Sequence, residues 1–69
     1  MYRYVMKIEG LNSREDVFTI RKLLNSEETT VVNMSFNKGE VTIDTDDLLE
    51  NIIFTLEGAG YLIEELEMI

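Results

Sequence analysis

The sequence predicts an α+β fold whose four strands and two helices follow the order β-α-β-β-α-β. Two kinds of pattern carry this prediction. Four short segments alternate between apolar and polar residues, which is the period of a half-buried strand. Two other segments repeat apolar residues every three or four positions, which is the period of an amphipathic helix with one buried face.

The first strand and the first helix are predicted on either side of Gly10. Residues 2–9 alternate and form the strand, and residues 14–25 form the helix. Ser13 is a good N-cap residue for this helix, and Asp16, three residues later, completes a variant of the capping box. The buried face of the helix is predicted from apolar residues at helical spacing, namely Val17, Ile20 and Leu24.

A β-hairpin is predicted in the middle of the chain. Its strands cover residues 32–36 and 41–44, and residues 37–40 form the turn between them. Glycine in such a short polar segment between two alternating runs is typical of a hairpin turn. The residues expected on one face of the first of these strands are Val32, Met34 and Phe36.

The second helix is predicted to begin near Asp47, which forms another capping-box pattern with Glu50. Gly58 and Gly60 end this helix. Its apolar face consists of Leu49, Ile52, Ile53 and Leu56.

A fourth strand is predicted over residues 61–66, and no linker or low-complexity segment interrupts the chain. We therefore expect residues 1–69 to form a single domain. The order of elements favours a ferredoxin-like sandwich, in which a four-stranded antiparallel sheet carries two helices on one face.

The chain is small and acidic, and this excludes several classes of function. It has 69 residues and a net charge of −8, and nine acidic residues but no basic ones follow Lys38. Binding to nucleic acid or to anionic membranes requires basic patches, so neither is an expected partner. A basic protein or a cation is electrostatically allowed. No apolar stretch approaches the ~20 residues of a membrane span and no signal-peptide pattern is present, so we expect a soluble, cytoplasmic protein.

Two segments near the ends of the chain carry a recognisable pattern. Residues 10–16 read Gly-Leu-Asn-Ser-Arg-Glu-Asp, and residues 56–61 read Leu-Glu-Gly-Ala-Gly-Tyr. They resemble the two ends of the heavy-metal-associated (HMA) domain, the small copper-chaperone fold, which normally has Gly-Met-x-Cys-x-x-Cys in the first segment and Ile-Glu-x-x-Gly-Tyr in the second. The resemblance covers almost the whole chain and implies the same ferredoxin-like fold.

The resemblance places Ser13 and Asp16 at the positions of the family's two metal-binding cysteines. Copper(I) and other soft cations require soft ligands such as thiolates. A serine hydroxyl stays protonated at neutral pH, an aspartate offers hard oxygen, and the chain contains no cysteine at all. We therefore expect no metal at Ser13 and Asp16 and no cofactor. The chain is interpreted as a degenerate member of the family that lacks the Cys-x-x-Cys motif.

The residue types also argue against an enzyme. The sequence has no histidine, no cysteine and no glycine-rich phosphate loop, so the usual nucleophile and base pairs are missing. Acylphosphatases share this topology but need an arginine-bearing phosphate cradle after the first strand, and the loop here offers only Arg14.

The family resemblance implies a protein partner. In the family, the metal loop and the first helix dock onto a domain of the same fold, or onto a metal-transporting ATPase that contains such a domain. We expect the equivalent docking face here to carry six residues, Leu11, Asn12, Arg14, Phe18, Arg21 and Tyr61. Phe18 is either an exposed anchor or a side chain over the core edge, and Tyr61 either joins this face or closes the core beneath the loop.

Three functional hypotheses stay open at this point. The first is a metal-free interaction or regulatory module that retains the docking face. The second is a metal carrier that uses non-cysteine ligands, such as methionine thioethers or the carboxylates of Asp44, Asp46 and Asp47, or that uses cysteines of a partner. The third is a small-ligand sensor that dimerises through its sheet edges.

Overall fold

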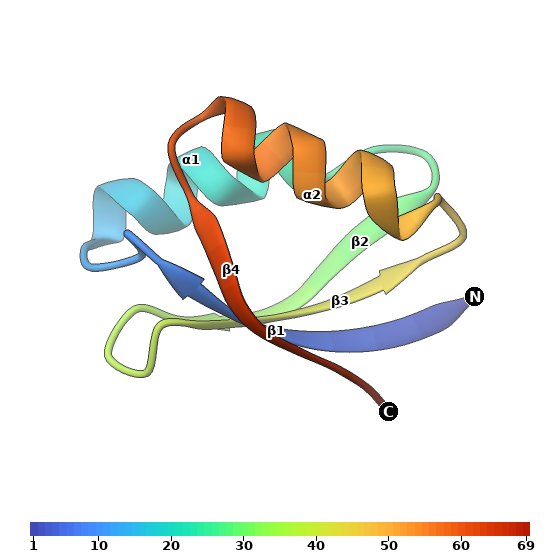
Figure 1. Cartoon of the computed structure of the whole chain (residues 1–69), viewed down its shortest axis with the longest axis horizontal. Helices are drawn as coiled ribbons and strands as arrows, with labels where there is room; N and C mark the ends of the chain where they lie inside the picture. The colour runs from blue at the N-terminus through green and yellow to red at the C-terminus, as the bar shows by residue number, and fades with distance from the viewer.

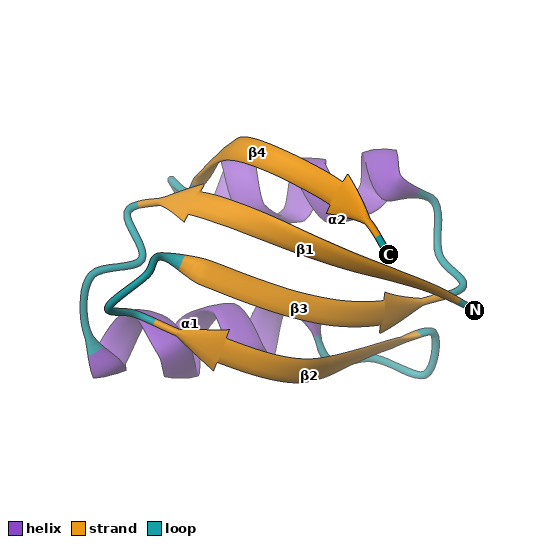
Figure 2. Ribbon diagram, turned by 90° about the horizontal axis from the view of Figure 1, so that it is seen from below, coloured by secondary structure: helices purple, strands orange, loops and turns teal.

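The computed structural model describes all residues from 1 to 69 and has the six elements in the predicted order (Figure 1). The strands pair in the order β2-β3-β1-β4, and every pairing is antiparallel. Both helices cover the same face of this sheet (Figure 2), which confirms the ferredoxin-like arrangement. The elements are β1 (Tyr2–Glu9), α1 (Arg14–Leu24), β2 (Thr29–Ser35), β3 (Glu40–Thr45), α2 (Leu49–Gly58) and β4 (Leu62–Met68).

The hydrophobic core lies between the sheet and the two helices. Removing its apolar side chains from water is the main favourable contribution to folding in so small a chain. Neither helix is long and apolar enough to cross a membrane. The eleven buried apolar residues are Met6, Ile8, Leu11, Ile20, Leu24, Val31, Val41, Ile43, Ile52, Leu56 and Tyr61.

Strand β2 differs from the prediction in where it begins and in which of its side chains face the core. It begins at Thr29, and its pairing with β3 shifts register between Val31 and Asn33. A bulge of this kind adds a residue to one strand and reverses which side chains face the core beyond it. Consequently Val31 is 7% exposed, whereas Val32, which the alternation placed with Met34 on one face, is 44% exposed.

The N-terminus of α2 also differs from the prediction. The N-cap residue is Leu48, and no side chain caps the helix. Asp47 lies one position too early to bond the backbone of the first turn, so the predicted capping box with Glu50 does not form. Its carboxylate instead accepts hydrogen bonds from the Leu48 N–H and from the Asn51 side-chain amide, both at 2.8 Å.

A buried pair of threonines joins β2 to β3. The Oγ1 atoms of Thr29 and Thr45 lie 2.7 Å apart, and both residues are almost fully buried. Thr45 Oγ1 also accepts a hydrogen bond from the backbone N–H of Asp47 at 3.0 Å. Buried hydroxyl groups need such partners, because an unpaired one loses its hydrogen bonds with water.

We expect Thr29→Val to lower the free energy of unfolding by about 1–2 kcal/mol, because it leaves the buried Thr45 hydroxyl without its partner. Urea unfolding at neutral pH measures this change. Thr30→Val is the matched control, since Thr30 is an exposed neighbour on the same strand and its substitution is expected to have little effect. Equal losses in the two variants would contradict the role of the pair.

Candidate functional site

The loop between β1 and α1 begins at a glycine that no other residue can easily replace. Gly10 has φ of +100°, a conformation that residues with a side chain rarely adopt. A Cβ atom at this position would also lie 3.2 Å from Cδ1 of Tyr61, which is tighter than ordinary contact. Gly10 thus lets the chain turn out of the sheet directly against the tyrosine ring.

The start of α1 is held by the predicted capping box. Ser13 is the N-cap residue, and its hydroxyl oxygen accepts a hydrogen bond from the Asp16 N–H at 3.4 Å. Oδ2 of Asp16 accepts in return from the backbone N–H groups of Asn12 and Ser13, at 3.1 and 3.2 Å. It also accepts from the Ser13 hydroxyl at 3.0 Å. These bonds satisfy N–H groups that an uncapped helix would leave without partners.

Tyr61 connects this cap to the other end of the chain. Its hydroxyl donates to Oδ1 of Asp16 at 2.8 Å, although the two residues are 45 positions apart. Tyr61 is 8% exposed and belongs to the hydrophobic core. Both oxygens of Asp16 are therefore engaged, and the tyrosine ring closes the core beneath the loop, one of the two alternatives that the sequence allowed.

The hydrogen bonds of this cluster shift two pKa values in opposite directions. The hydrogen bond from Tyr61, followed by that from the Asn12 N–H, lowers the pKa of Asp16 below 3.8 because both favour its charged form. Burial raises the pKa of Tyr61 above 10.0, and the hydrogen bond to Asp16 raises it further. The cluster is therefore a neutral phenol bonded to a carboxylate across the neutral pH range.

The positions that would bind metal in the resembled family are thus occupied by structural hydrogen bonds. Nowhere in the structure do three Asp, Glu, His or Cys side chains gather as a metal site would need. The carboxylates considered as alternative ligands have separate partners. Asp44 binds Arg3 through two hydrogen bonds of 2.7 and 2.9 Å, and Asp46 lies 2.9 Å from the N-terminal amino group of Met1.

The six predicted docking residues divide into two groups. Leu11 is 1% exposed and Tyr61 is buried in the core, so neither presents an accessible side chain. The others, Asn12, Arg14, Phe18 and Arg21, are exposed. Phe18 is 65% exposed, so it stands away from the core edge.

Two exposed residues of the helix layer are missing from the predicted face. Lys22 lies four residues after Phe18, next to it on the surface of α1. Phe54, on α2, is 70% exposed. Helical spacing was the signal that could have found both. Lys22 follows the buried Ile20 by two residues and Phe54 follows the buried Ile52 by two, so each lies nearly opposite that buried side chain on its helix.

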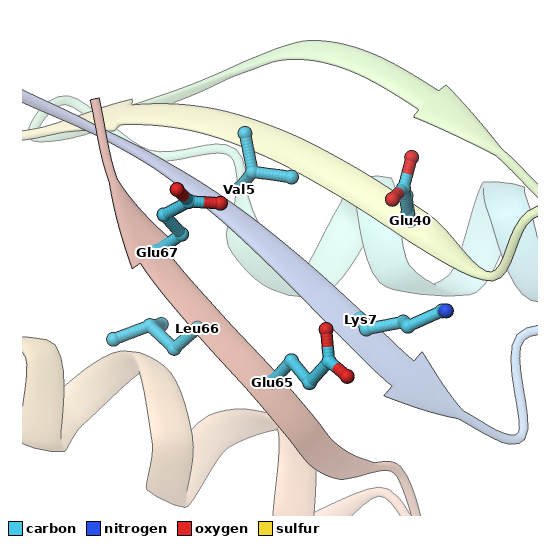
Figure 3. Close-up of a pocket in the computed structure, with 6 residues that line it drawn as sticks. All are labelled: Val5, Lys7, Glu40, Glu65, Leu66 and Glu67. Atoms are coloured by element: carbon cyan, nitrogen blue, oxygen red, sulfur yellow. The ribbon is translucent and has the colours of Figure 1, made fainter.

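The open face of the sheet carries a hollow of about 370 Å³. At its centre, Lys7 of β1 lies in register with Glu40 of β3 on one side and Glu65 of β4 on the other (Figure 3). Charges that stay in contact with water interact weakly, so this arrangement contributes little to stability. The full lining is Val5, Lys7, Glu40, Glu65, Leu66 and Glu67.

Comparisons with known proteins add one informative match. No protein-family model matches this chain, and no curated protein matches it. The structure is similar to the NMR structure of a heavy metal binding protein from Thermotoga maritima, with a TM-score of 0.77 and 21% sequence identity. The match covers 97% of this chain and 98% of that one. The two chains share their fold. At this identity the likeness supports the HMA resemblance for the fold alone, and the loss of a cysteine motif stays a prediction.

We expect Tyr61→Phe to destabilise the protein at neutral pH, because it removes the hydroxyl bonded to Asp16. A carboxylate whose pKa is lowered by folding stabilises the protein at pH values above its unfolded-state pKa, near 3.8 for Asp16. This stabilisation disappears as the pH falls through the folded-state pKa. The difference in the free energy of unfolding between the natural protein and Tyr61→Phe should therefore become smaller in acid. Urea unfolding at pH 7 and pH 2.5 measures it. Tyr2→Phe, at an exposed tyrosine, is the control, and a difference independent of pH would contradict this linkage.

Gly10→Ala is expected to lower the free energy of unfolding by about 1–3 kcal/mol, because alanine is strained at positive φ and its Cβ meets the Tyr61 ring. Gly58→Ala is the matched control, since Gly58 ends α2 with no atom within 4 Å of an added Cβ. Thermal or urea unfolding compares the two variants. A tolerated alanine at position 10 would show that the loop can move away from the ring.

Proposed function

We propose that this chain is a degenerate heavy-metal-associated domain that acts as a small, non-catalytic protein-interaction or regulatory module in the cytoplasm. One observation carries the proposal. Ser13 and Asp16, at the positions of the resembled family's ligands, are bonded to each other and to Tyr61. Side chains committed to capping a helix and closing a core are poorly suited to exchange a metal ion.

The outer surface of α1 supports the docking part of the proposal. Phe18 is surrounded at helical spacing by Arg14, Arg21 and Lys22, and none of these cations forms an ion pair within the protein. Aromatic residues, phenylalanine among them, and arginine are enriched in protein interfaces relative to the rest of the surface. Despite the net charge of the whole chain, this surface is locally basic, so the partner we propose presents a carboxylate-rich surface. Candidates are a domain of the same fold, alone or within a metal-transporting ATPase.

A second candidate is a metal-binding protein that uses non-cysteine ligands or the cysteines of a partner. The observation that favours it is the shared fold with a protein named for heavy metal binding. It would require either hard-oxygen ligands or a site completed by another chain, because this sequence has no thiol.

Metal titration separates the two candidates. We expect copper(I), zinc and calcium to cause no stoichiometric amide NMR shifts in residues 10–16 of the natural protein. The double variant Ser13→Cys with Asp16→Cys is the positive control, because it restores two thiolates at the family's spacing and should bind copper(I) stoichiometrically. Tight binding by the natural protein at residues 10–16 would overturn the metal-free proposal.

A photo-crosslinking residue at position 18, introduced in cells that produce the protein, tests the docking surface. We expect discrete crosslinked species that disappear when Arg14→Glu and Arg21→Glu are added, with the partner chain identified by mass spectrometry. The same probe at Thr30, an exposed site on β2, is the control. Equal crosslinking from both positions would argue against docking through α1.

A further inference from the structure

The exposed face of α1 has a matching counterpart on α2. On α1, Arg14 lies four residues before Phe18, and Arg21 and Lys22 lie three and four residues after it. Residues at these spacings are surface neighbours on a helix. Each of the three basic side chains is exposed and without an ion pair. One acid, Glu15, also lies on this face, so the surface of α1 is an exposed aromatic ring within a mainly basic patch.

The face of α2 repeats this pattern with the opposite charge. Glu50 lies four residues before Phe54, and Glu57 lies three residues after it. Both glutamates are exposed and form no ion pair. The helix contains no basic residue. The two phenylalanines are among the most exposed apolar side chains of the structure, at 65% and 70%. Each helix therefore presents an aromatic ring, one among cations and the other among carboxylates.

We propose that these two faces bind each other between two copies of this chain, with α1 of each copy against α2 of the other. This inference rests on the proposed docking role of α1 and names its partner. Charge complementarity identifies the occupant, because the cations around Phe18 match the carboxylates around Phe54. An internal pairing of the two faces is excluded, since both point away from the sheet and remain exposed.

The arrangement of the helices allows a closed pair. The two helices lie side by side over the sheet and run in opposite directions, as the colour gradient in Figure 1 shows. A two-fold axis parallel to the helices, between two facing helix layers, places α1 of one copy over α2 of its partner and the reverse. Such an interface uses the same patch on both copies and closes at two subunits. It buries both phenylalanines of each copy.

The size of the face predicts a weak association. The layers stack along the 22 Å direction in the view of Figure 1, so the helix layer can extend over at most 28 by 18 Å, the other two dimensions of the whole Cα trace. A face within those limits has a smaller area than the about 800 Å² that each partner contributes to a standard interface. The like net charge of two copies opposes association further, although ions screen it beyond about 8 Å at physiological salt. We therefore expect a dimer that forms and dissociates with concentration.

Sedimentation of the purified protein from micromolar to millimolar concentration tests the pair directly. We expect a shift from the 8.0 kDa monomer towards twice that mass, with no larger species. Phe18→Ser and Phe54→Ser should each raise the dissociation constant at least about tenfold, because a buried aromatic anchor is lost twice per dimer. A monomer at every concentration, or open-ended assembly, would overturn the proposal.

Charge reversal gives a test that a general loss of stability cannot imitate. Arg14→Glu with Arg21→Glu makes both helix faces acidic, and Glu50→Arg with Glu57→Arg makes both basic. Each double variant alone should remain monomeric. Mixed together, they should form a heterodimer, since both contacts between them are again complementary. Glu64→Arg with Glu67→Arg on β4 is the control for net charge, because it changes the charge as much as the α2 variant does but away from the helices, and this variant should still dimerise on its own.

The outcome also separates this inference from the proposed function. If the protein stays monomeric and the two reversed variants do not associate, the second copy is not the partner. Crosslinks from position 18 to a different protein would then still support docking through α1. If position 18 yields no specific crosslink in cells and no dimer forms in solution, both proposals fail together.

Discussion

The hydrogen bond from Tyr61 to Asp16 holds together the loop at Gly10, the start of α1 and the segment that follows α2. It joins Asp16, in the first turn of α1, to Tyr61, three residues after the end of α2, and so adds a side-chain contact between the two β-α-β halves that the sheet already joins. The same tyrosine ring fills the space beneath Gly10 and completes the core. Substitutions at Gly10, Asp16 and Tyr61 are therefore coupled, and their effects should not add.

Local patterns in the sequence were sufficient for much of this architecture. The capping box of Ser13 and Asp16 involves residues three apart, and the first turn of a helix brings such residues together whatever the rest of the chain does. The order of elements likewise followed from local periodicity. The bond to Tyr61 could not be predicted in this way, because it depends on a packing of distant segments that no spacing in the sequence encodes.

The errors in the prediction also have physical causes that local sequence patterns do not contain. The alternation around Val32 was correct locally, but a bulge against β3 inverted it, and a bulge is a property of two paired strands. Leu11 was assigned to the docking face because its equivalent in the resembled family lies in the metal loop. A domain this small needs nearly every apolar residue in its core, and Leu11 is only 1% exposed.

The uneven distribution of charge along the sequence corresponds to a separation of charge on the surface of the folded protein. Every basic residue lies at or before Lys38, and nine of the acidic ones follow it. Because each half of the chain contributes one helix to the same layer, this asymmetry along the chain becomes a division across one surface, basic over α1 and acidic over α2. The net charge of −8 alone allowed a basic protein or a cation as partner. The distribution of that charge instead favours a partner that carries both signs in the opposite order, and a second copy turned about a two-fold axis meets that requirement.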